Sequence, residues 1–331
     1  MVVIAITGGN GDVGTELSKQ LSKVEEVSKI LLTCRTQAKA EATIASLVEA
    51  TGKDASFFDY VLLDVMDIKT IVASLDKFPT VDRLLLNVGG LSKCQIHEQS
   101  GAVDCMVLNT MGHAVLAEGL IKKNKIAKGG RIIYVGSEVC RSVYSFAGLK
   151  PEYLGKFGEK DIEWAIGQNY KDFASGIIPI RTQLGDYANA KIIGTMYTSQ
   201  LAKEHPDLTI LTTSPGAIHG KDGKGTGFAN EGLFPMKPLM KYAPWMFKLM
   251  QVTQDLDVGV ARIVDGTLVG EPKWENGSVI MSPPPFWGAR GPPVDNRPMV
   301  PYLADEDLCE KAAIAVREWN TKWAANAGVT L

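Results

Sequence analysis

The stretch Thr7-Gly8-Gly9-Asn10-Gly11-Asp12-Val13-Gly14 decides the fold, because of what stands on either side of it. The residues before it, 2–6, are all apolar, which is typical of a parallel strand buried on both faces. After it, apolar residues recur at helical spacing, at Val13, Leu17, Leu21 and Val24. A strand, a glycine-rich turn and a helix in this order form the setting in which Gly-x-Gly-x-x-Gly predicts a dinucleotide site.

The glycine-rich turn has the chemistry that a pyrophosphate needs. Glycines let the backbone come close to the ligand, and a helix N-terminus offers free N–H groups and the positive end of the helix dipole. A tight turn without a ligand is the alternative interpretation. We expect cofactor contacts along the whole turn, from Thr7, Gly8, Gly9, Asn10, Gly11, Asp12, Val13 and Gly14.

The second expected strand, residues 29–34, ends at Arg35. An acidic residue at this place would hold the ribose 2′-hydroxyl of NAD, whereas an arginine accommodates the 2′-phosphate of NADP. No acid stands at positions 33–37, so Arg35, with Lys39 nearby, favours NADP(H). The alternative is a solvated arginine at the start of a helix.

Strands and helices alternate through the first 135 residues. We expect further strands at 57–63, 83–86, 131–135, 208–212 and 278–280, and helices at 37–51, 68–75, 103–123, 185–204, 258–268 and 305–324. This alternation predicts an α/β fold with a doubly wound parallel sheet, the Rossmann fold, whose ligands bind at the carboxyl ends of the strands.

Two long segments interrupt this pattern within an expected single domain at residues 1–281. Residues 140–183 are rich in aromatic side chains and too long for an ordinary connection, so we expect a substrate-side insert. Residues 217–254 mix Gly, Pro, Met and aromatics, which indicates either a mobile lid over an apolar substrate or a packed subdomain. Residues 282–331 form a C-terminal extension, with an irregular proline-rich stretch at 283–298.

A second motif, Tyr187-Ala-Asn-Ala-Lys191, lies in the expected helix at 185–204. Side chains four apart share one helix face, and an adjacent ammonium favours the phenolate and lowers its pKa. The pair can therefore act as a general acid or base near neutral pH. Such a spacing also arises often by chance, so the motif gains meaning only from a cofactor site beside it.

Composition limits the classes of function. Of the 331 residues, 45% are hydrophobic and 22% charged, which is the ordinary globular range. The net charge of -2 gives no broad basic field, which argues against nucleic acid as a partner. No apolar run reaches the roughly 18 residues of a membrane span, so we expect no transmembrane segment.

Cysteine usage and the N-terminus indicate the compartment. The five cysteines are scattered without a Cys-x-x-Cys pair, which indicates free thiols in a reducing compartment and no metal site. The N-terminus lacks the basic flank and cleavage site of a secretory signal. We therefore expect the protein in the cytoplasm or an organelle interior, and not secreted.

With these residues placed, the chain resembles the short-chain dehydrogenase/reductase family over roughly residues 2–281. Thr7-Gly8 with Gly14 resembles the family's glycine turn, although Asp12 stands where the common form has its second glycine. The other matching segments are Asp64-Val65, Asn87-Val88-Gly89-Gly90, Asn109, Ser137, Tyr187 with Lys191, and Pro215-Gly216.

The resemblance implies a role for each of these residues. Ser137 would hydrogen-bond the substrate oxygen, and Tyr187 would exchange the proton. Lys191 would lower the pKa of Tyr187 and bind the nicotinamide ribose, and Asn109 would hold a relay water. Beyond the glycine turn, the implied cofactor contacts are Arg35, Asp64, Val65, Asn87, Gly89, Tyr187, Lys191, Pro215 and Gly216.

Thr33-Cys34-Arg35 and Lys39-Ala40-Glu41 are similar to the NADPH-using branch of retinol dehydrogenases and protochlorophyllide reductases. Asp161-Ile162-Glu163-Trp164 resembles that branch's insert, although here the insert is longer, since Ser137 and Tyr187 are 50 residues apart. The implied reaction is hydride transfer between NADPH and a carbonyl or alcohol on an apolar, ring-bearing small molecule.

Three alternatives remain open from the sequence. One is a protochlorophyllide-type reduction of a double bond. Another is a non-catalytic regulatory protein that senses NADP(H). An epimerase acting on a nucleotide sugar is the third, but Arg35 and the apolar 217–254 segment speak against it. The resemblance is compatible with a homodimer or a monomer.

Overall fold

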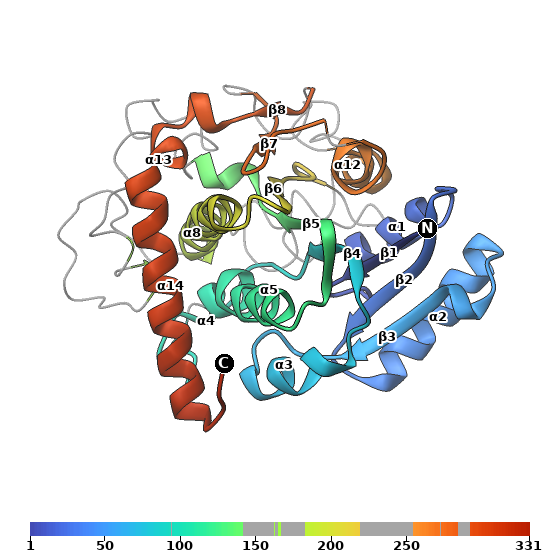
Figure 1. The fold of residues 1–331 in the computed structure, drawn as a ribbon, viewed down its shortest axis with the longest axis horizontal. Helices are drawn as coiled ribbons and strands as arrows, with labels where there is room; N and C mark the ends of the chain where they lie inside the picture. Colours follow the sequence, from blue (N-terminus) through green and yellow to red (C-terminus); the bar gives the residue numbers. More distant parts are fainter. Residues whose placement is uncertain are drawn as a thin grey trace, which may run out of the picture.

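The computed structural model describes residues 1–93, 95–141, 162, 165–166, 183–218, 254–271, 273–283 and 292–331. Nearly all of the expected insert at 140–183 and lid at 217–254 lies outside these residues. The described part forms a single α/β domain in which helices cover both faces of one central sheet (Figure 1).

The sheet has eight strands in the order β3-β2-β1-β4-β5-β6-β7-β8. The strands are β1 (Val2–Ile6), β2 (Val27–Cys34), β3 (Phe58–Leu62), β4 (Val81–Leu86), β5 (Ile126–Val135), β6 (Thr209–Thr213), β7 (Val279–Met281) and β8 (Val294–Asp295). All neighbours pair in parallel except β7 and β8. The strand order reverses between β1 and β4, and such a switch point is where doubly wound sheets bind ligands.

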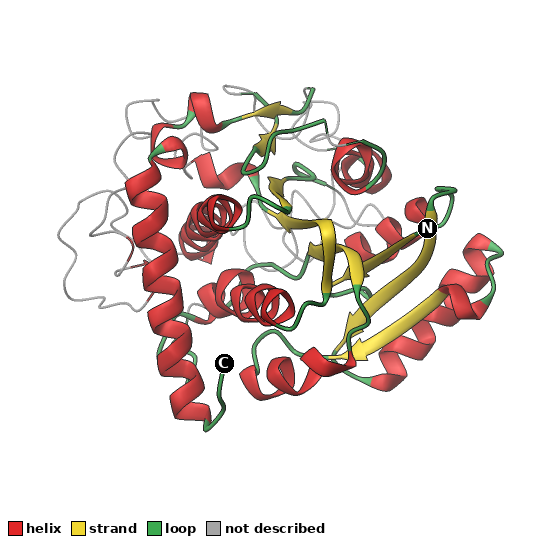
Figure 2. Ribbon diagram, viewed as in Figure 1, coloured by secondary structure: helices red, strands yellow, loops and turns green. Residues whose placement is uncertain are grey.

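Alternating strand residues feed two separate apolar cores. In β1, Ile4 and Ile6 point to one core, whereas Ala5 points to the other. The first core lies under α1 (Asp12–Leu21), α2 (Gln37–Thr51) and α12 (Leu256–Ile263). The second lies under α3 (Ile68–Ser74), α5 (Gly112–Lys122), α8 (Gln183–Glu204) and α14 (Glu306–Ala327). Figure 2 shows these two helical layers on either side of the strands.

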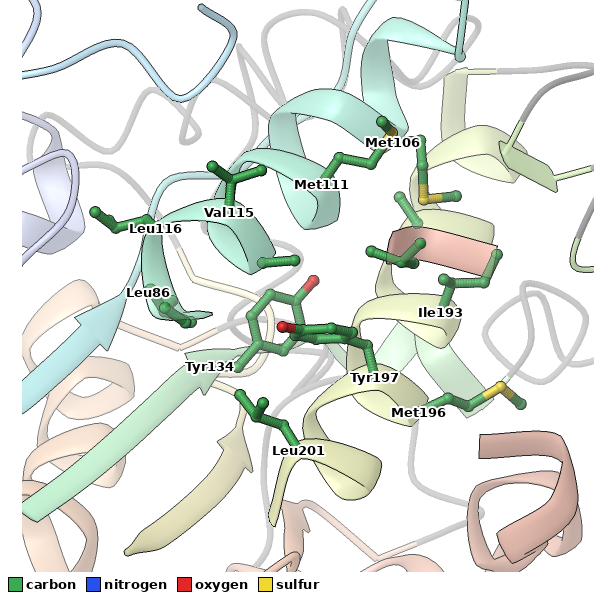
Figure 3. Packing of buried hydrophobic residues seen from close by; sticks show 14 of the residues in the cluster. Leu86, Met106, Met111, Val115, Leu116, Tyr134, Ile193, Met196, Tyr197 and Leu201 are labelled. Carbon is green, nitrogen blue, oxygen red and sulfur yellow. The ribbon is translucent and has the colours of Figure 1, made fainter. Parts of the chain in front are cut away.

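Helix α8 comes unusually close to the sheet where it passes β5. A Cβ atom on Gly194 would lie 2.4 Å from the hydroxyl oxygen of Tyr134, so only glycine fits at this crossing. Figure 3 shows Tyr134 of β5 among the apolar side chains of α5 and α8. The close crossing places the first three turns of α8, with Tyr187 and Lys191, beside the carboxyl end of β5.

Helix α14 anchors the C-terminal part of the chain on the second helical layer. Arg317 donates from Nε to Glu118 of α5 at 2.7 Å and from Nη1 to Glu204 of α8 at 2.9 Å. Asp305 caps the helix by accepting the Leu308 N–H at 3.1 Å. The extension therefore packs along the α5 and α8 layer (Figure 1).

The sequence located most elements to within a few residues, but the expected helix at 258–268 ends at Ile263 and continues as a π-helical turn at Val264–Leu268. Two other differences concern the proline-rich stretch and the helix at 103–123. Residues 283–298 were expected to be irregular, but Val294–Asp295 forms β8, antiparallel to β7. Asp295 stabilises the pairing of β8 with β7, because its carboxylate accepts the Val279 N–H at 3.2 Å and forms an ion pair with Arg297. In the expected helix at 103–123, a π-helical turn at Val107–Met111 separates α4 (Asp104–Met106) from α5. Among the described residues, no helix is both long and apolar enough to cross a membrane.

Candidate active site

The glycine-rich turn joins β1 to α1 at the switch point of the sheet. Gly8 has a left-handed φ of 64°, which favours glycine. A Cβ atom on Gly14 would lie 2.5 Å from the Gly8 carbonyl oxygen, and one on Gly9 would lie 2.6 Å from the Leu32 side chain. These three glycines are therefore required by the turn itself and by its packing on β2.

Gly11, unlike these three glycines, is not required by close packing within the protein. A Cβ atom there would have only the Gly8 carbonyl oxygen nearby, at 3.4 Å, so the protein's own packing leaves room for a side chain. Gly11 also N-caps α1 without a side-chain hydrogen bond, whereas Thr36, Asp67 and Asp305 cap α2, α3 and α14. The first N–H groups of α1 beside exposed Asn10, Gly11 and Asp12 thus fit an anionic group such as a pyrophosphate.

The end of β2 lies against this turn. Thr33 accepts the Gly8 N–H on its hydroxyl at 3.2 Å and the Gly9 N–H on its carbonyl at 3.1 Å. Arg35, two residues further, is exposed, as is Lys39 in the first turn of α2. Both side chains are exposed just beyond the strand end that bonds the turn through Thr33.

Thr7 connects the glycine-rich turn to the end of β4. Its hydroxyl accepts the N–H groups of Asn87 at 2.7 Å and of Val88 at 3.0 Å. The Asn87 amide in turn donates to the Thr7 carbonyl at 2.9 Å. At the end of β3, Asp64 accepts the Met66 N–H at 3.0 Å, and Val65 is buried. The predicted cofactor contacts of β1, β3 and β4 therefore line one edge of the sheet.

Lys191 reaches from α8 into this edge. Its Nζ donates to the Val135 carbonyl at the end of β5 at 2.7 Å and lies 5.6 Å from the ring centre of Tyr187. A Cβ atom on Gly89 would lie 3.0 Å from Lys191 Nζ and 2.7 Å from Asn109 Oδ1. Gly89 thus lets the β4 turn pass between Asn109 and Lys191.

Tyr187 and Ser137 face each other across the site. Burial raises the pKa of the Tyr187 phenol, and a hydrogen bond with Ser137 partly offsets this. Burial lowers the pKa of Lys191 to about 7. We expect Lys191 to lower the pKa of Tyr187, but burial is the largest influence on both groups and disfavours the charged form of each.

Asn109 sits in the π-helical turn between α4 and α5, and such turns often occur at functional sites. Its amide donates to the carbonyls of Gly90 and Cys105, each at 2.9 Å, and its Oδ1 accepts the Gly90 N–H at 3.0 Å. Its main-chain carbonyl accepts the Tyr134 hydroxyl at 2.9 Å. The Asn109 side chain therefore fixes the Gly90 turn, and any relay water would have to share the main-chain carbonyl.

The Pro215-Gly216 turn follows β6 and completes the edge. Gly216 has a left-handed φ of 76°. Its N–H donates to the Ser214 hydroxyl at 3.0 Å, and the Pro215 carbonyl accepts the Gln254 amide at 2.6 Å. The turn is thus fixed from β6 on one side and from Gln254 on the other.

Sequence reasoning missed three buried polar residues around the site: His113, Glu138 and Gln254. His113 lies under Thr7, with Nε2 3.4 Å from the Thr7 hydroxyl. Glu138 follows Ser137 directly, and a charged residue after an apolar strand was a usable signal. Nothing in the sequence marked Gln254. Among the described residues, no group of three or more His, Cys, Asp or Glu side chains could hold a metal ion.

The site as a whole combines a glycine-rich turn with half-buried Ser137 and buried Tyr187 and Lys191 at the carboxyl edge of a doubly wound sheet. This arrangement fits a dinucleotide site of the Rossmann type. Residues 2–149 match the short chain dehydrogenase family. Over this stretch the chain is similar to the short-chain dehydrogenase/reductase family.

Individual relatives are about a quarter identical to the chain over the aligned stretch. The putative steroid dehydrogenase 3 of Caenorhabditis elegans is 26% identical over 68% of this chain and 71% of its own length. Retinol dehydrogenase 12 of Bos taurus is 23% identical over 66% of this chain, and the match spans only 62% of that relative. The structure of salutaridine reductase from Papaver somniferum is similar in fold, with a TM-score of 0.58, 20% identity and coverage of 84% of this chain and 99% of that one.

Proposed function

We propose that the protein is an NADP(H)-dependent oxidoreductase that interconverts a carbonyl and an alcohol on an apolar, ring-bearing small molecule. The observation that carries this proposal is the convergence of Ser137, Tyr187 and Lys191 at the edge that holds the glycine-rich turn. A protein that only sensed the nucleotide would not need a buried proton donor beside it. The names of the relatives, a retinol dehydrogenase and a putative steroid dehydrogenase, support a ring-bearing substrate.

When bound, NADPH would supply the hydride, and the residues of the chain would handle the proton and the developing charge. Ser137 donates a hydrogen bond to the substrate oxygen and stabilises its negative charge. Tyr187 gives its phenolic proton to the same oxygen. Burial raises the pKa of Tyr187, so its phenol is protonated at neutral pH and ready to act as the acid.

Lys191 would bind the ribose and return a proton to Tyr187. Because burial lowers the pKa of Lys191 to about 7, the amine can both hold and release a proton near neutral pH. Asn109 keeps the Gly90 turn and the neighbouring Gly89 in place below Lys191. The cofactor would be held by the glycine-rich turn, by Asp64 and Val65, by Asn87 and Gly89, and by Pro215 and Gly216.

Arg35 supports NADPH over NADH. It is exposed at the end of β2, and no acidic residue stands at positions 33–37 to hold a 2′-hydroxyl. An Arg35→Ala variant should lose affinity for NADPH at least about tenfold more than for NADH, since a phosphate–guanidinium contact is charge-assisted and bidentate. An unchanged ratio of the two affinities would remove Arg35 from the argument.

The test of the proposed function is turnover. Purified protein is mixed with NADPH and a panel of cyclic ketones, aromatic aldehydes and cyclic enones, and absorbance at the reduced nicotinamide band is followed. Oxidation of NADPH with a ketone or aldehyde supports the proposal. Reduction of the enone double bond alone would favour the double-bond reductase, and tight NADPH binding without turnover would favour the sensor.

A further inference from the structure

Glu138 directly follows Ser137 and is buried, with 6% of its surface exposed. Glutamates are almost never buried unless a partner compensates the charge. The carboxylate is thus held inside the protein beside the proposed proton donor, in a position that the mechanism above does not use.

The contacts of Glu138 join it to the nicotinamide-side turn. Its Oε2 accepts the hydroxyl of Ser214, and that hydroxyl oxygen accepts the Gly216 N–H at 3.0 Å. Its Oε1 accepts the Ser282 N–H at 3.3 Å. The Ser214 hydroxyl donates its single proton to Glu138, so toward the turn it can only accept a hydrogen bond. Glu138 therefore orients the Ser214 hydroxyl so that its oxygen accepts the Gly216 N–H.

Two arginines complete this group. Arg262 of α12 lies with Nη2 4.0 Å from Glu138 Oε1 and donates to the Ser282 hydroxyl at 2.9 Å. Arg141 donates from Nη1 to the Ser282 carbonyl at 2.5 Å and from Nε to the Glu138 carbonyl at 3.4 Å. The ends of β5, β6 and β7 and helix α12 therefore meet at one carboxylate. We call Glu138, Arg141, Ser214, Arg262 and Ser282 the Glu138 bracket.

An amide could not replace this carboxylate without loss. Both oxygens of Glu138 accept hydrogen bonds, one from a hydroxyl and one from a backbone N–H. In Glu138→Gln the new NH₂ group would face either the Ser214 hydroxyl or the Ser282 N–H, both of which are donors. The negative charge of Glu138 beside Arg262 would also be lost. A buried pair that loses one partner leaves the other charge uncompensated.

Glu138 also acts on the proton donor through space. Tyr187 is faced by Lys191 of its own helix, by Cys105 of α4, and by Glu138 and Cys140 of the segment after β5. Of these four residues around Tyr187, Glu138 is the one with a carboxylate. Its negative charge disfavours the phenolate and raises the pKa of Tyr187.

We propose that Glu138 is a positioning residue that fixes Ser137 relative to the Ser214–Gly216 turn. This proposal rests on the proposed function, because it assigns the turn to the nicotinamide half of NADPH. The Glu138 bracket thus couples the substrate-oxygen contact to the cofactor contact, through side chains far apart in the sequence.

The experiment compares Glu138→Gln with Ser214→Ala and with a control, Glu118→Gln. Glu118 on α5 also accepts a tyrosine hydroxyl and an arginine, from Tyr197 at 2.8 Å and Arg317 at 2.7 Å, but it lies in the α14 layer. NADPH binding is measured by nicotinamide fluorescence, and binding of adenosine 2′,5′-bisphosphate, which carries only the adenine half, by calorimetry. Thermal unfolding by circular dichroism shows that each variant is folded.

Glu138→Gln and Ser214→Ala should weaken NADPH at least about tenfold, because buried charge-assisted hydrogen bonds are lost, and leave the bisphosphate within about twofold. Glu118→Gln should change neither. Equal losses for both probes, or wild-type affinity in Glu138→Gln, would overturn the inference. Wild-type protein that binds neither probe would overturn the proposed function, and the inference with it.

A pH profile separates the charge of Glu138 from its hydrogen bonds. With any ketone or aldehyde that the panel identifies, the alkaline limb of kcat reports loss of the Tyr187 proton. Glu138→Gln should move this limb to lower pH by about half a unit or more, since a neighbouring negative charge is removed. Ser214→Ala keeps the charge and should not move the limb, and a shift of the same size in both variants would contradict the charge effect.

Discussion

His113 gives the structure a specific sensitivity to acid. The imidazole lies on α5 with 2% of its surface exposed, edge-on to the Tyr134 ring at 6.0 Å and below Thr7. Burial lowers its pKa from 6.5 to about 3, and the charge of Lys191 adds in the same direction. The folded protein therefore keeps His113 neutral until the pH falls to about 3.

The sign and size of the effect follow from proton binding. Between pH 6.5 and 3 the unfolded chain takes up a proton on this histidine and the folded protein does not, so the free energy of unfolding falls as the pH falls. A pH of 5 lies about 1.5 units below the pKa of the histidine in the unfolded chain. At about 1.4 kcal/mol per unit, the free energy of unfolding is about 2 kcal/mol lower than at neutral pH. The loss would approach its limit only near pH 3.

The assay is urea unfolding of wild type and His113→Gln at pH 7.5 and pH 5.0, followed by circular dichroism. Wild type should lose about 2 kcal/mol more than His113→Gln between the two pH values. Other groups that titrate in this range act on both proteins and cancel in the difference. A His205→Gln control, outside this pocket, should keep the wild-type loss. Equal losses in wild type and His113→Gln would show that His113 is not held neutral by burial, and would refute the reasoning.

Two further predictions test the turn and the C-terminal extension. Gly14→Ala, whose Cβ atom would lie 2.5 Å from a carbonyl oxygen, should cost about 1–3 kcal/mol of stability and abolish NADPH binding. Gly11→Ala, with no contact closer than 3.4 Å, should keep the wild-type Tm but weaken NADPH binding, and a Tm loss equal to that of Gly14→Ala would contradict the assignment. Arg317→Ala should lower the urea-derived free energy of unfolding by about 1 kcal/mol after allowance for solvent screening, because its two carboxylate partners are only partly exposed. Lys311→Ala removes an exposed ion pair on the same helix and should lower the free energy of unfolding by less than about 0.5 kcal/mol. Equal losses for the two substitutions would show that Arg317 does not anchor the helix more strongly than a surface ion pair does.

The sequence predicted the fold well because the signals were local. An apolar run, the glycine-rich turn and a helical repeat identify β1 and α1, and the same alternation continues to β6. Ser137, Asn109 and the Tyr187 pair could be placed at the site because each follows or faces a strand end, and parallel strands bring their ends to one edge.

The sequence could not predict what depends on distant contacts. Glu138 bonds Ser214 and Ser282, which are 76 and 144 residues away, and nothing near Glu138 announces either partner. The π-helical turn at Asn109 has no sequence signal of its own, since its apolar residues continue the helical pattern. The pKa of Tyr187 depends on burial by several elements, which is why a Lys four residues away did not predict its direction.

Proton donation by Tyr187 is the central claim, and one measurement tests it most directly. NADPH oxidation with a carbonyl substrate from the panel is compared for wild type, Tyr187→Phe and Tyr197→Phe, which removes another buried hydroxyl from the same helix. We predict that Tyr187→Phe lowers kcat by about 100-fold or more, the usual contribution of a general acid, while Tyr197→Phe keeps most of the activity. Equal turnover by Tyr187→Phe and wild type would contradict the account.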